Sequence, residues 1–381
     1  MRNRCFRFYL LLMAAVFCAG IIMPITVFAA AGERKSPTLV LESANSNENT
    51  FSGGEFVSIL KGNVVFTYDD IRIRSDEATW WRNEGMVDFR KQVKVTRGAS
   101  TLTCDRMHFT RKTNLITAKG KFDFFDTLEQ TRLTGKEAEY HVQNRNFILR
   151  GNPRMIRFDT TASETLTISG ITMSYSDSLK RATVKDSVKI TKGPLTSKCR
   201  FAHYFTETNS AQLRGNPRVT YEMHQVTGDS IDLVFGKETL RSALVTGHSH
   251  GFYVDTSGAG NDTGYTHVWG DSLYMTVSDS GMLDTLWSYG KALSKYFTSN
   301  KPDLVNEASG KVMLMSFAER GNVDRVKIWG NARSKYYIEE DDNSGTNEAS
   351  GDSILVAFRK GKASLLTLAG RARGVYFPRG M

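Results

Sequence analysis

One short element occurs nine times along this 381-residue chain, and it constrains the fold more than any other feature. It has a small residue, a polar pair and then alternating apolar positions, as in "SDEATW" from Ser75, "CDRMHF" from Cys104 and "GDSIDL" from Gly228. Successive copies are 29, 31, 35, 29, 29, 42, 40 and 41 residues apart. Such a ladder predicts one small unit stacked many times, because a single unit of this length cannot bury its apolar face alone.

A second element alternates with the first. It has an apolar residue, any residue, glycine, often Asn, and then alternating apolar residues, as in "LKGNVVF" around Gly62, "LRGNPRMIRF" around Gly151 and "IWGNARSKYY" around Gly330. Glycine beside Asn suits a positive φ angle or a bulge at the corner of a sheet. The segments around Lys91 and Asp186 occupy the same place without a glycine.

The residues between these corners alternate apolar and polar with a period of two, as at Val64 and Phe66, which is typical of strands with one buried face. No run of ten or more residues has helical periodicity. We therefore expect an all-β fold: a solenoid-like two-sheet roll, or β-jellyroll, of stacked antiparallel strands that is open at both ends. The last three repeats are longer, by residues 256–266, 298–309 and 341–350, and insertions at one corner predict loops on one side of the stack.

The N-terminus has the pattern of an export signal. Arg2, Arg4 and Arg7 precede an apolar stretch, and small residues at Ala29 and Ala31 suit cleavage after either one. The alternative is a retained membrane anchor, because the apolar stretch is long enough to span a bilayer. Loss of the three arginines lowers the formal charge from +10 to +7 (10 − 3), which favours a polyanionic partner.

The predicted organisation has four parts. Residues 1–29 are a signal peptide, residues 30–55 a linker and first strand, residues 56–255 β-jellyroll repeats, and residues 256–381 further, longer repeats of the same roll. Nothing after the signal peptide is apolar enough to cross a membrane as a helix.

The sequence predicts no enzyme, no cofactor and no metal centre. His248, His250 and His267 are the best metal candidates, but other repeats carry ordinary polar residues at the place of the first two. The Ser-x-x-Lys match at Ser288 lacks a helix, and the glycine-rich loop from Gly258 lacks a βαβ unit. The acidic run at residues 339–342 could bind calcium or form a solvated loop tip.

The two cysteines after the signal peptide, Cys104 and Cys199, occupy the same position in repeats two and five. Neighbouring strands lie about 4.8 Å apart, so at least three steps along the stack separate the two residues by about 14 Å. Disulfide partners need Cα atoms within about 7 Å. We therefore predict two free, buried thiols.

The interleaved elements, such as "LKGNVVF" followed by "IRSDEATWW" and "LTGKEAEYHVQNRNFILRGNPRMI", resemble the OstA-like (LptA-like) family of periplasmic lipopolysaccharide transport proteins, which includes the periplasmic domain of LptD. The resemblance covers Phe56 to about Tyr221 and extends more loosely through Phe377. It implies a β-jellyroll whose apolar groove holds the acyl chains of lipopolysaccharide or a related glycolipid. It also implies a non-enzymatic carrier or bridge to the outer membrane, acting in the periplasm.

The resemblance further implies partners: other lipopolysaccharide transport proteins, joined by pairing of edge strands, and end-to-end copies of the chain itself. Association with the inner or outer membrane would then run through these partners. No nucleic acid is expected, because basic residues that alternate with aromatic ones here are the polar face of a strand.

If the chain is such a carrier, the inward residues of its early repeats line the lipid path. They are Val64, Phe66, Ile71, Ile73, Ala78, Trp80, Val87, Phe89, Val93, Val95, Met107, Phe109, Phe122, Phe124, Ala138, Tyr140, Phe147 and Leu149. The alternative is a structural or adhesive β-solenoid that binds no lipid and fills its interior with side chains. A polysaccharide-acting β-helix would need acids in a column on adjacent repeats, and the sequence has no such column.

Overall fold

The computed structural model describes residues 39–68, 70–128, 130–141, 146–158, 165–176, 178–205, 207–236, 240–256, 262–278, 281–318, 322–338, 344–359 and 362–378. Within these ranges every regular element is a β-strand, and no helix long and apolar enough to cross a membrane is found there. The prediction of an all-β roll is confirmed. The predicted signal peptide lies outside the described residues.

The chain divides into two compact units, and the first comprises residues 1–193 and 203–207. Its strands are β1 (Leu39–Ser43), β2 (Ser46–Ser52), β3 (Glu55–Tyr68), β4 (Ile71–Trp81), β5 (Met86–Arg97), β6 (Ser100–Thr110), β7 (Leu115–Asp126), β8 (Thr131–His141), β9 (Asn146–Arg150), β10 (Arg154–Phe158), β11 (Thr165–Ser169), β12 (Thr172–Ser176) and β13 (Arg181–Lys192).

The second unit comprises residues 194–202 and 208–381, and β14 (Leu195–Phe205) contributes residues to both units. Its other strands are β15 (Ser210–Arg214), β16 (Arg218–Tyr221), β17 (His224–Thr227), β18 (Ser230–Phe235), β19 (Leu240–Asp255), β20 (Gly264–Val277), β21 (Leu283–Thr298), β22 (Lys301–Phe317), β23 (Val323–Ile338), β24 (Gly345–Arg359), β25 (Lys362–Ala369) and β26 (Arg373–Pro378).

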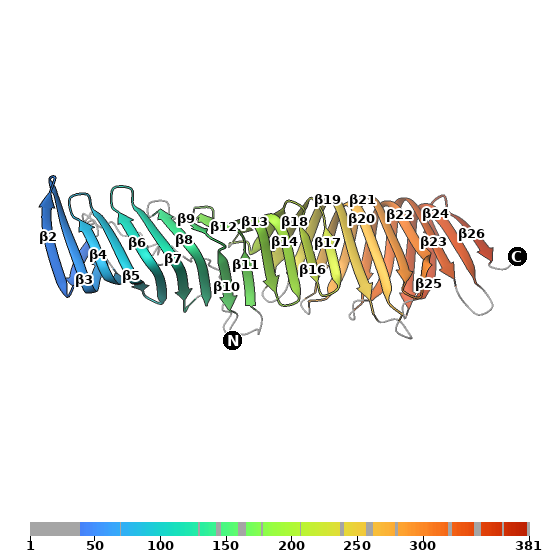
Figure 1. Ribbon diagram of the computed structural model, residues 1–381. Helices are drawn as coiled ribbons and strands as arrows, with labels where there is room; N and C mark the ends of the chain where they lie inside the picture. Colours follow the sequence, from blue (N-terminus) through green and yellow to red (C-terminus); the bar gives the residue numbers. More distant parts are fainter. Residues whose placement is uncertain are drawn as a thin grey trace, which may run out of the picture. The chain divides into compact units, whose positions relative to one another are not determined.

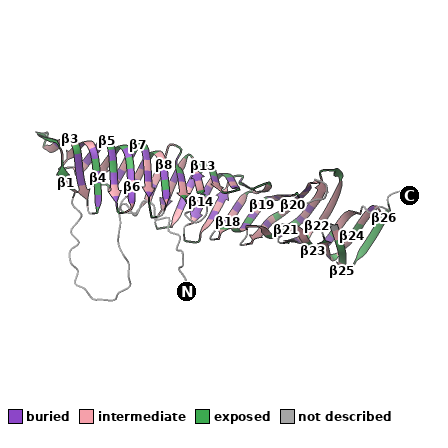
Figure 2. Ribbon diagram, turned by 90° about the horizontal axis from the view of Figure 1, so that it is seen from below, coloured by how far each residue is buried: buried purple, intermediate pink, exposed green. Residues whose placement is uncertain are grey.

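In the first unit, β3 to β8 form a run of antiparallel neighbours, and each strand pairs with the next (Figure 1). The pairing register shifts near the middle of every strand, for example between Lys61 and Val64 and between Lys119 and Phe122. The two halves of each strand therefore belong to two walls that face each other. Inward and outward residues alternate along these strands, which gives the alternating buried and exposed bands in Figure 2.

The corners explain why the two sequence elements interleave. Gly120 has φ +72°, a conformation that costs an L-residue about 1–2 kcal/mol. A Cβ atom at this glycine would lie 2.8 Å from Cβ of Asp105, the first polar residue of the preceding small-polar element. Lys91 and Asp186, at the same place in their repeats, adopt φ angles of 63° and 59°, so a corner forms there without a glycine.

Proline divides the strand at two of these corners. Gly151 and Asn152 both have positive φ, and Pro153 follows them between β9 and β10. The same Gly-Asn-Pro sequence, ending at Pro217, separates β15 from β16. Proline has no N–H to donate to a ladder, so the strand stops at each of these two corners.

In the second unit, β19 to β24 are successive antiparallel neighbours of 14 to 17 residues (Figure 1). Register shifts at their corners define two walls. The first wall contains residues 249–255, 264–269, 292–298, 301–309, 332–338 and 345–350, and the second wall contains residues 240–246, 272–277, 283–289, 312–317, 323–329 and 353–359. β25 extends the second wall and β26 extends the first.

The prediction that the extra residues of the long repeats form loops is wrong for most of them. Residues 301–309 lie in β22 and residues 345–350 lie in β24, where they pair with neighbouring strands. Strand pairing satisfies their backbone N–H and C=O groups, so the extra length goes into the first wall of the second unit.

Candidate functional site

The eighteen residues predicted to line a lipid path lie in the first unit, and sixteen of them are buried. The other two, Trp80 and Phe109, are partly exposed. Each lies one residue before the end of its strand, where side chains reach the edge of a wall.

The structure brings facing members of this set into contact. Phe66, from one wall, has its ring centroid 5.3 Å from that of Phe89 and 5.4 Å from that of Trp80, both on the opposite wall. Both pairs are edge-to-face, which is a favourable arrangement of aromatic rings. The interior of the first unit is therefore filled by its own side chains around Phe66, which has no exposed surface.

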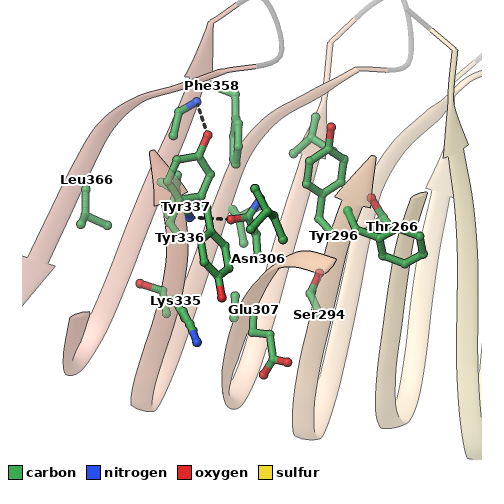
Figure 3. A pocket seen from close by; sticks show the side chains of 18 of the residues that line it. Thr266, Ser294, Tyr296, Asn306, Glu307, Lys335, Tyr336, Tyr337, Phe358 and Leu366 are labelled. Atoms are coloured by element: carbon green, nitrogen blue, oxygen red, sulfur yellow. Dashed lines mark hydrogen bonds between the residues drawn. The ribbon is translucent and has the colours of Figure 1, made fainter. Parts of the chain in front are cut away.

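The second unit has buried core residues, and it also contains open space between its walls. A cavity of about 620 Å³ lies between its two walls, and such a volume is typical of sites for small ligands. At one end the rings of Tyr253 and Phe317 meet across the walls at 5.5 Å. Tyr336 also reaches across, because its hydroxyl accepts a hydrogen bond of 3.3 Å from the Ala363 N–H (Figure 3).

The two walls of this cavity differ in chemistry. The first wall contributes polar, charged and tyrosine side chains together with a few apolar ones, and the second wall contributes mainly aliphatic and phenyl side chains. The first set includes Tyr253, Asp255, Thr266, Ser294, Tyr296, Phe297, Lys301, Leu304, Asn306, Glu307, Ser334, Lys335, Tyr336, Ile338 and Asn347, and the second includes Met315, Val323, Val326, Val356, Phe358, Ser364 and Leu366. The polar and charged groups of the lining therefore lie mostly on the first wall.

Two tyrosines of the cavity, Tyr253 and Tyr296, have raised pKa values. Burial, with a smaller effect of nearby Asp255, raises the pKa of Tyr253 to about 12, and burial also raises the pKa of Tyr296. His224 stacks on Tyr253 with ring centroids 4.4 Å apart and accepts a hydrogen bond from the Val254 N–H. Burial lowers the pKa of His224, so this end of the cavity carries no histidine charge at neutral pH.

The histidines considered for metal binding do not form one site. His248 lies at a corner with φ 46° and places its Nδ1 3.0 Å from a carboxylate oxygen of Asp229. His250 instead stacks on His267, with its Nε2 atom 3.0 Å from the Nδ1 atom of that ring. Among the described residues, no group of three or more His, Cys, Asp or Glu side chains is placed to hold a metal ion.

The other sequence matches carry no chemistry in the structure. The Ser288 hydroxyl is buried and donates a 2.7 Å hydrogen bond to the carbonyl oxygen of Trp269, so it is engaged with the backbone. The glycine-rich segment at residues 257–261 and the acidic run at residues 339–342 lie outside the described residues.

The prediction of free, buried thiols is confirmed, because Cys104 and Cys199 are both buried and unpaired. Burial raises the pKa of Cys104 to about 12 and that of Cys199 to about 11. Thiolates at these positions are therefore scarce at neutral pH, and neither cysteine has the character of a nucleophile.

The fold and its interior define an all-β, two-walled roll, and one part of the chain is similar to a known protein family. Residues 43–180 match the model of the LptA/(LptD N-terminal domain) lipopolysaccharide transport proteins. The family resemblance of the repeats is therefore confirmed over this segment, which runs from β1 to the turn before β13.

One solved structure similar to the chain is LptH, the LptA-homologous periplasmic component of the conserved lipopolysaccharide transport device from Pseudomonas aeruginosa. The two are 16% identical, the likeness covers 38% of this chain and 82% of LptH, and the TM-score is 0.21. No curated protein matched the chain.

Proposed function

We propose that this protein is a non-enzymatic carrier or bridge in the periplasm that conveys lipopolysaccharide, or a related glycolipid, towards the outer membrane. One observation carries the proposal: the segment that matches the transport family, residues 43–180, is also the segment whose inward side chains form a continuous apolar interior.

In this proposal the acyl chains occupy the interior of the roll, along the eighteen inward residues from Val64 to Leu149. Each methylene group removed from water contributes about 0.8 kcal/mol, so a few acyl chains supply a large driving force. Because Phe66 and Phe89 touch in the structure, the walls must separate for a chain to enter. The acyl chain would then replace contacts that facing side chains make with each other.

The edges of the two units support assembly with partners. In the first unit, β1 and β2 each pair with β3, and among the described residues neither has a second strand partner. In the second unit, β25 and β26 both pair with β24. Edge strands present unpaired N–H and C=O groups that another strand can match, which would allow pairing with other transport proteins or with a second copy of the chain.

A second candidate function is a structural or adhesive roll that binds no lipid. The observation that favours it is the packed interior of the first unit, where Phe66, Phe124 and Leu149 have no exposed surface. A lipid conduit and a structural roll differ in one respect: only the conduit opens its walls to a lipid.

Removal of the protein from its own cells tests the proposal. If the protein carries lipopolysaccharide, depletion should reduce the lipopolysaccharide that surface labelling detects and increase the amount at the inner membrane. Restoration by the wild-type chain is the control for indirect effects. Unchanged surface lipopolysaccharide in cells that lack the protein would refute the transport role and leave the structural role.

A further inference from the structure

A cluster of aromatic side chains, the aromatic face, lies on the outer side of the first wall of the second unit. It consists of His250, Phe252, Tyr265, His267 and Trp269, from β19 and β20, and each of them is partly exposed. Along the two strands these residues alternate with Tyr253 and Thr266, which line the cavity. Successive side chains of a strand point to opposite sides, so the aromatic face is directed away from the interior of the roll.

The centre of the aromatic face is flat. The ring planes of His250, His267 and Trp269 lie within 20° of one another, with centroids 5.0 to 5.4 Å apart. Two imidazole nitrogens, one from each histidine, are 3.0 Å apart, and a hydrogen bond between them acts in the plane of the rings. The three rings are therefore strongly offset and leave their outer faces open. Phe252 and Tyr265 form a second parallel pair beside them, with Phe252 tilted by 43° from His267.

The aromatic face is particular to this part of the repeat array. Trp269 and His267 lie one and three residues before the small-polar element that begins at Gly270. The same positions in β4 are occupied by Arg74 and Arg72, whose side chains are exposed. Charged residues suit the outer side of a wall, whereas a contiguous group of partly exposed rings indicates a surface for a partner.

The strands that flank the aromatic face add no net charge beside it. On one side, Gln225 and Thr227 of β17 pair with residues of the face. On the other side, Lys295 of β21 forms an ion pair with Glu307 at 2.9 Å. Burial lowers the pKa of both histidines of the face, so they are neutral at neutral pH. A polyanion therefore finds no positive charge to attract it here.

An uncharged partner with apolar faces and polar edges suits such a surface. Hydrogen atoms on carbon carry a small positive charge and are attracted to the negative face of an aromatic ring. All rings of the aromatic face except that of Phe252 also have nitrogen or oxygen atoms, which can hydrogen-bond to hydroxyl groups. A chain of β-linked pyranose sugars has both properties: it is a straight, flat ribbon with C–H groups on its faces and hydroxyl groups along its edges.

We propose that the aromatic face is a binding surface for an extended, uncharged glycan chain of β-linked pyranose sugars, which lie flat on the rings of His250, His267 and Trp269. Hydroxyl groups along the edge of the chain bond to Gln225 and Thr227. The proposal goes beyond the proposed function, because the surface lies outside the roll and the match to the transport family ends at residue 180, before β19.

Two hexasaccharides of the same composition test the proposal. Binding of cellohexaose, which is β-linked, and of maltohexaose, which is α-linked, to the purified protein is measured by isothermal titration calorimetry. The two sugars have the same formula and charge, but the α-linked chain curves away from a flat surface. Maltohexaose should bind about two- to tenfold more weakly for each ring contact that it loses.

Substitutions locate the binding surface. Trp269→Ala and Tyr265→Ala should each weaken the binding of cellohexaose about two- to tenfold, whereas Trp269→Phe should retain part of it. Phe377→Ala is the matched control, because Phe377 is a 50% exposed aromatic residue of β26, which extends the same wall, and is not part of the aromatic face. This variant should bind like the wild type. Circular dichroism of each variant verifies that it is folded.

Equal affinity for the two sugars, absence of binding by either, or full affinity of both alanine variants of the aromatic face would overturn the proposal. Tighter binding of a single-stranded oligothymidine than of cellohexaose would also overturn it, because the rings would then be a surface for nucleobases. These outcomes are distinct from failure of the transport role, which is read from lipopolysaccharide in cells. Glycan binding would stand even if depletion left surface lipopolysaccharide unchanged.

Discussion

Substitution of a corner glycine by alanine tests how the repeats lock together. Gly120 has φ +72°, and an added Cβ would lie 2.7 Å from Cγ and 2.8 Å from Cβ of Asp105. The positive φ angle alone costs an alanine about 1–2 kcal/mol. Because the contact involves the Cβ atom of Asp105, it cannot be relieved by rotation of that side chain, and crowding adds about 1–3 kcal/mol.

Gly98 isolates the first of these two contributions. It also has a positive φ angle, +50°, but a Cβ there would meet no atom within 4 Å. Gly98→Ala should therefore cost about 1–2 kcal/mol, whereas Gly120→Ala should cost about 2–5 kcal/mol. Both residues lie in the first unit, so urea denaturation followed by tryptophan fluorescence compares them on the same transition.

A double-mutant cycle completes the test. Asp105→Gly removes the atoms that crowd Gly120, so the variant with both Gly120→Ala and Asp105→Gly should recover about 1–3 kcal/mol relative to the sum of the two single changes. If Gly120→Ala costs no more than Gly98→Ala, or if the cycle shows no coupling, the account of the corners is wrong.

Three further predictions concern charge, thiols and packing. Burial opposes ionisation of Asp88, but hydrogen bonds from Arg106 and Arg90 outweigh it and lower the pKa of this carboxyl group. The ionised carboxylate therefore stabilises the folded state at pH values above the pKa of the unfolded chain. This contribution is lost as the pH falls through the lower pKa of the folded state. Asp88→Asn should cost about 1–3 kcal/mol at pH 7 and flatten the stability profile below about pH 4, as urea titrations at several pH values will report; an unchanged profile would contradict this. At pH 7 a maleimide should label neither Cys104 nor Cys199 in the folded protein, and it should label both in urea. Fast labelling without urea would contradict the burial of these two thiols. Phe66→Ala should cost about 3–5 kcal/mol in urea titration, whereas Phe51→Ala, at a side chain 73% exposed, should cost under about 0.5 kcal/mol; similar losses would refute the packed interior.

Much of the fold could be predicted from the sequence because its signals are local. Alternation with a period of two determines which residues face inward, and Val64, Phe66 and Phe89 are buried as expected. Corners depend on positive φ angles, which glycine and asparagine favour, so the Gly-Asn elements marked them in the sequence. Lys91 and Asp186 also have positive φ angles, and their residue types gave no such signal.

The cavity was not predicted, because it depends on a difference of volume between equivalent positions. Ser294 and Phe124 satisfy the same alternating pattern, so a pattern of apolar and polar residues treats them alike. The signal was present in the Ala-x-Ser sequences that follow Gly290 and Gly330. Aligning the corner glycines and comparing side-chain volumes would have found it.

The histidines show a second limit of the pattern. Residues two apart on a regular strand face the same way, and this rule made His248 and His250 candidates for one metal site. His248 instead has a positive φ angle, and the register shifts between Thr246 and Ser249. A corner within a strand interrupts the period of two, so alternation has to be counted from each corner separately.

Photo-crosslinking in living cells tests the central claim, that the interior of the roll carries lipopolysaccharide, most directly. A photoreactive amino acid is placed at Phe66, Phe89 or Leu149, which face inward, and at Arg72, which faces outward and pairs with Glu42 at 3.0 Å, as the control. The account predicts lipopolysaccharide adducts at the three inward positions and none at Arg72. A folded, exported protein that gives no inward adducts, or equal adducts at Arg72, would contradict it.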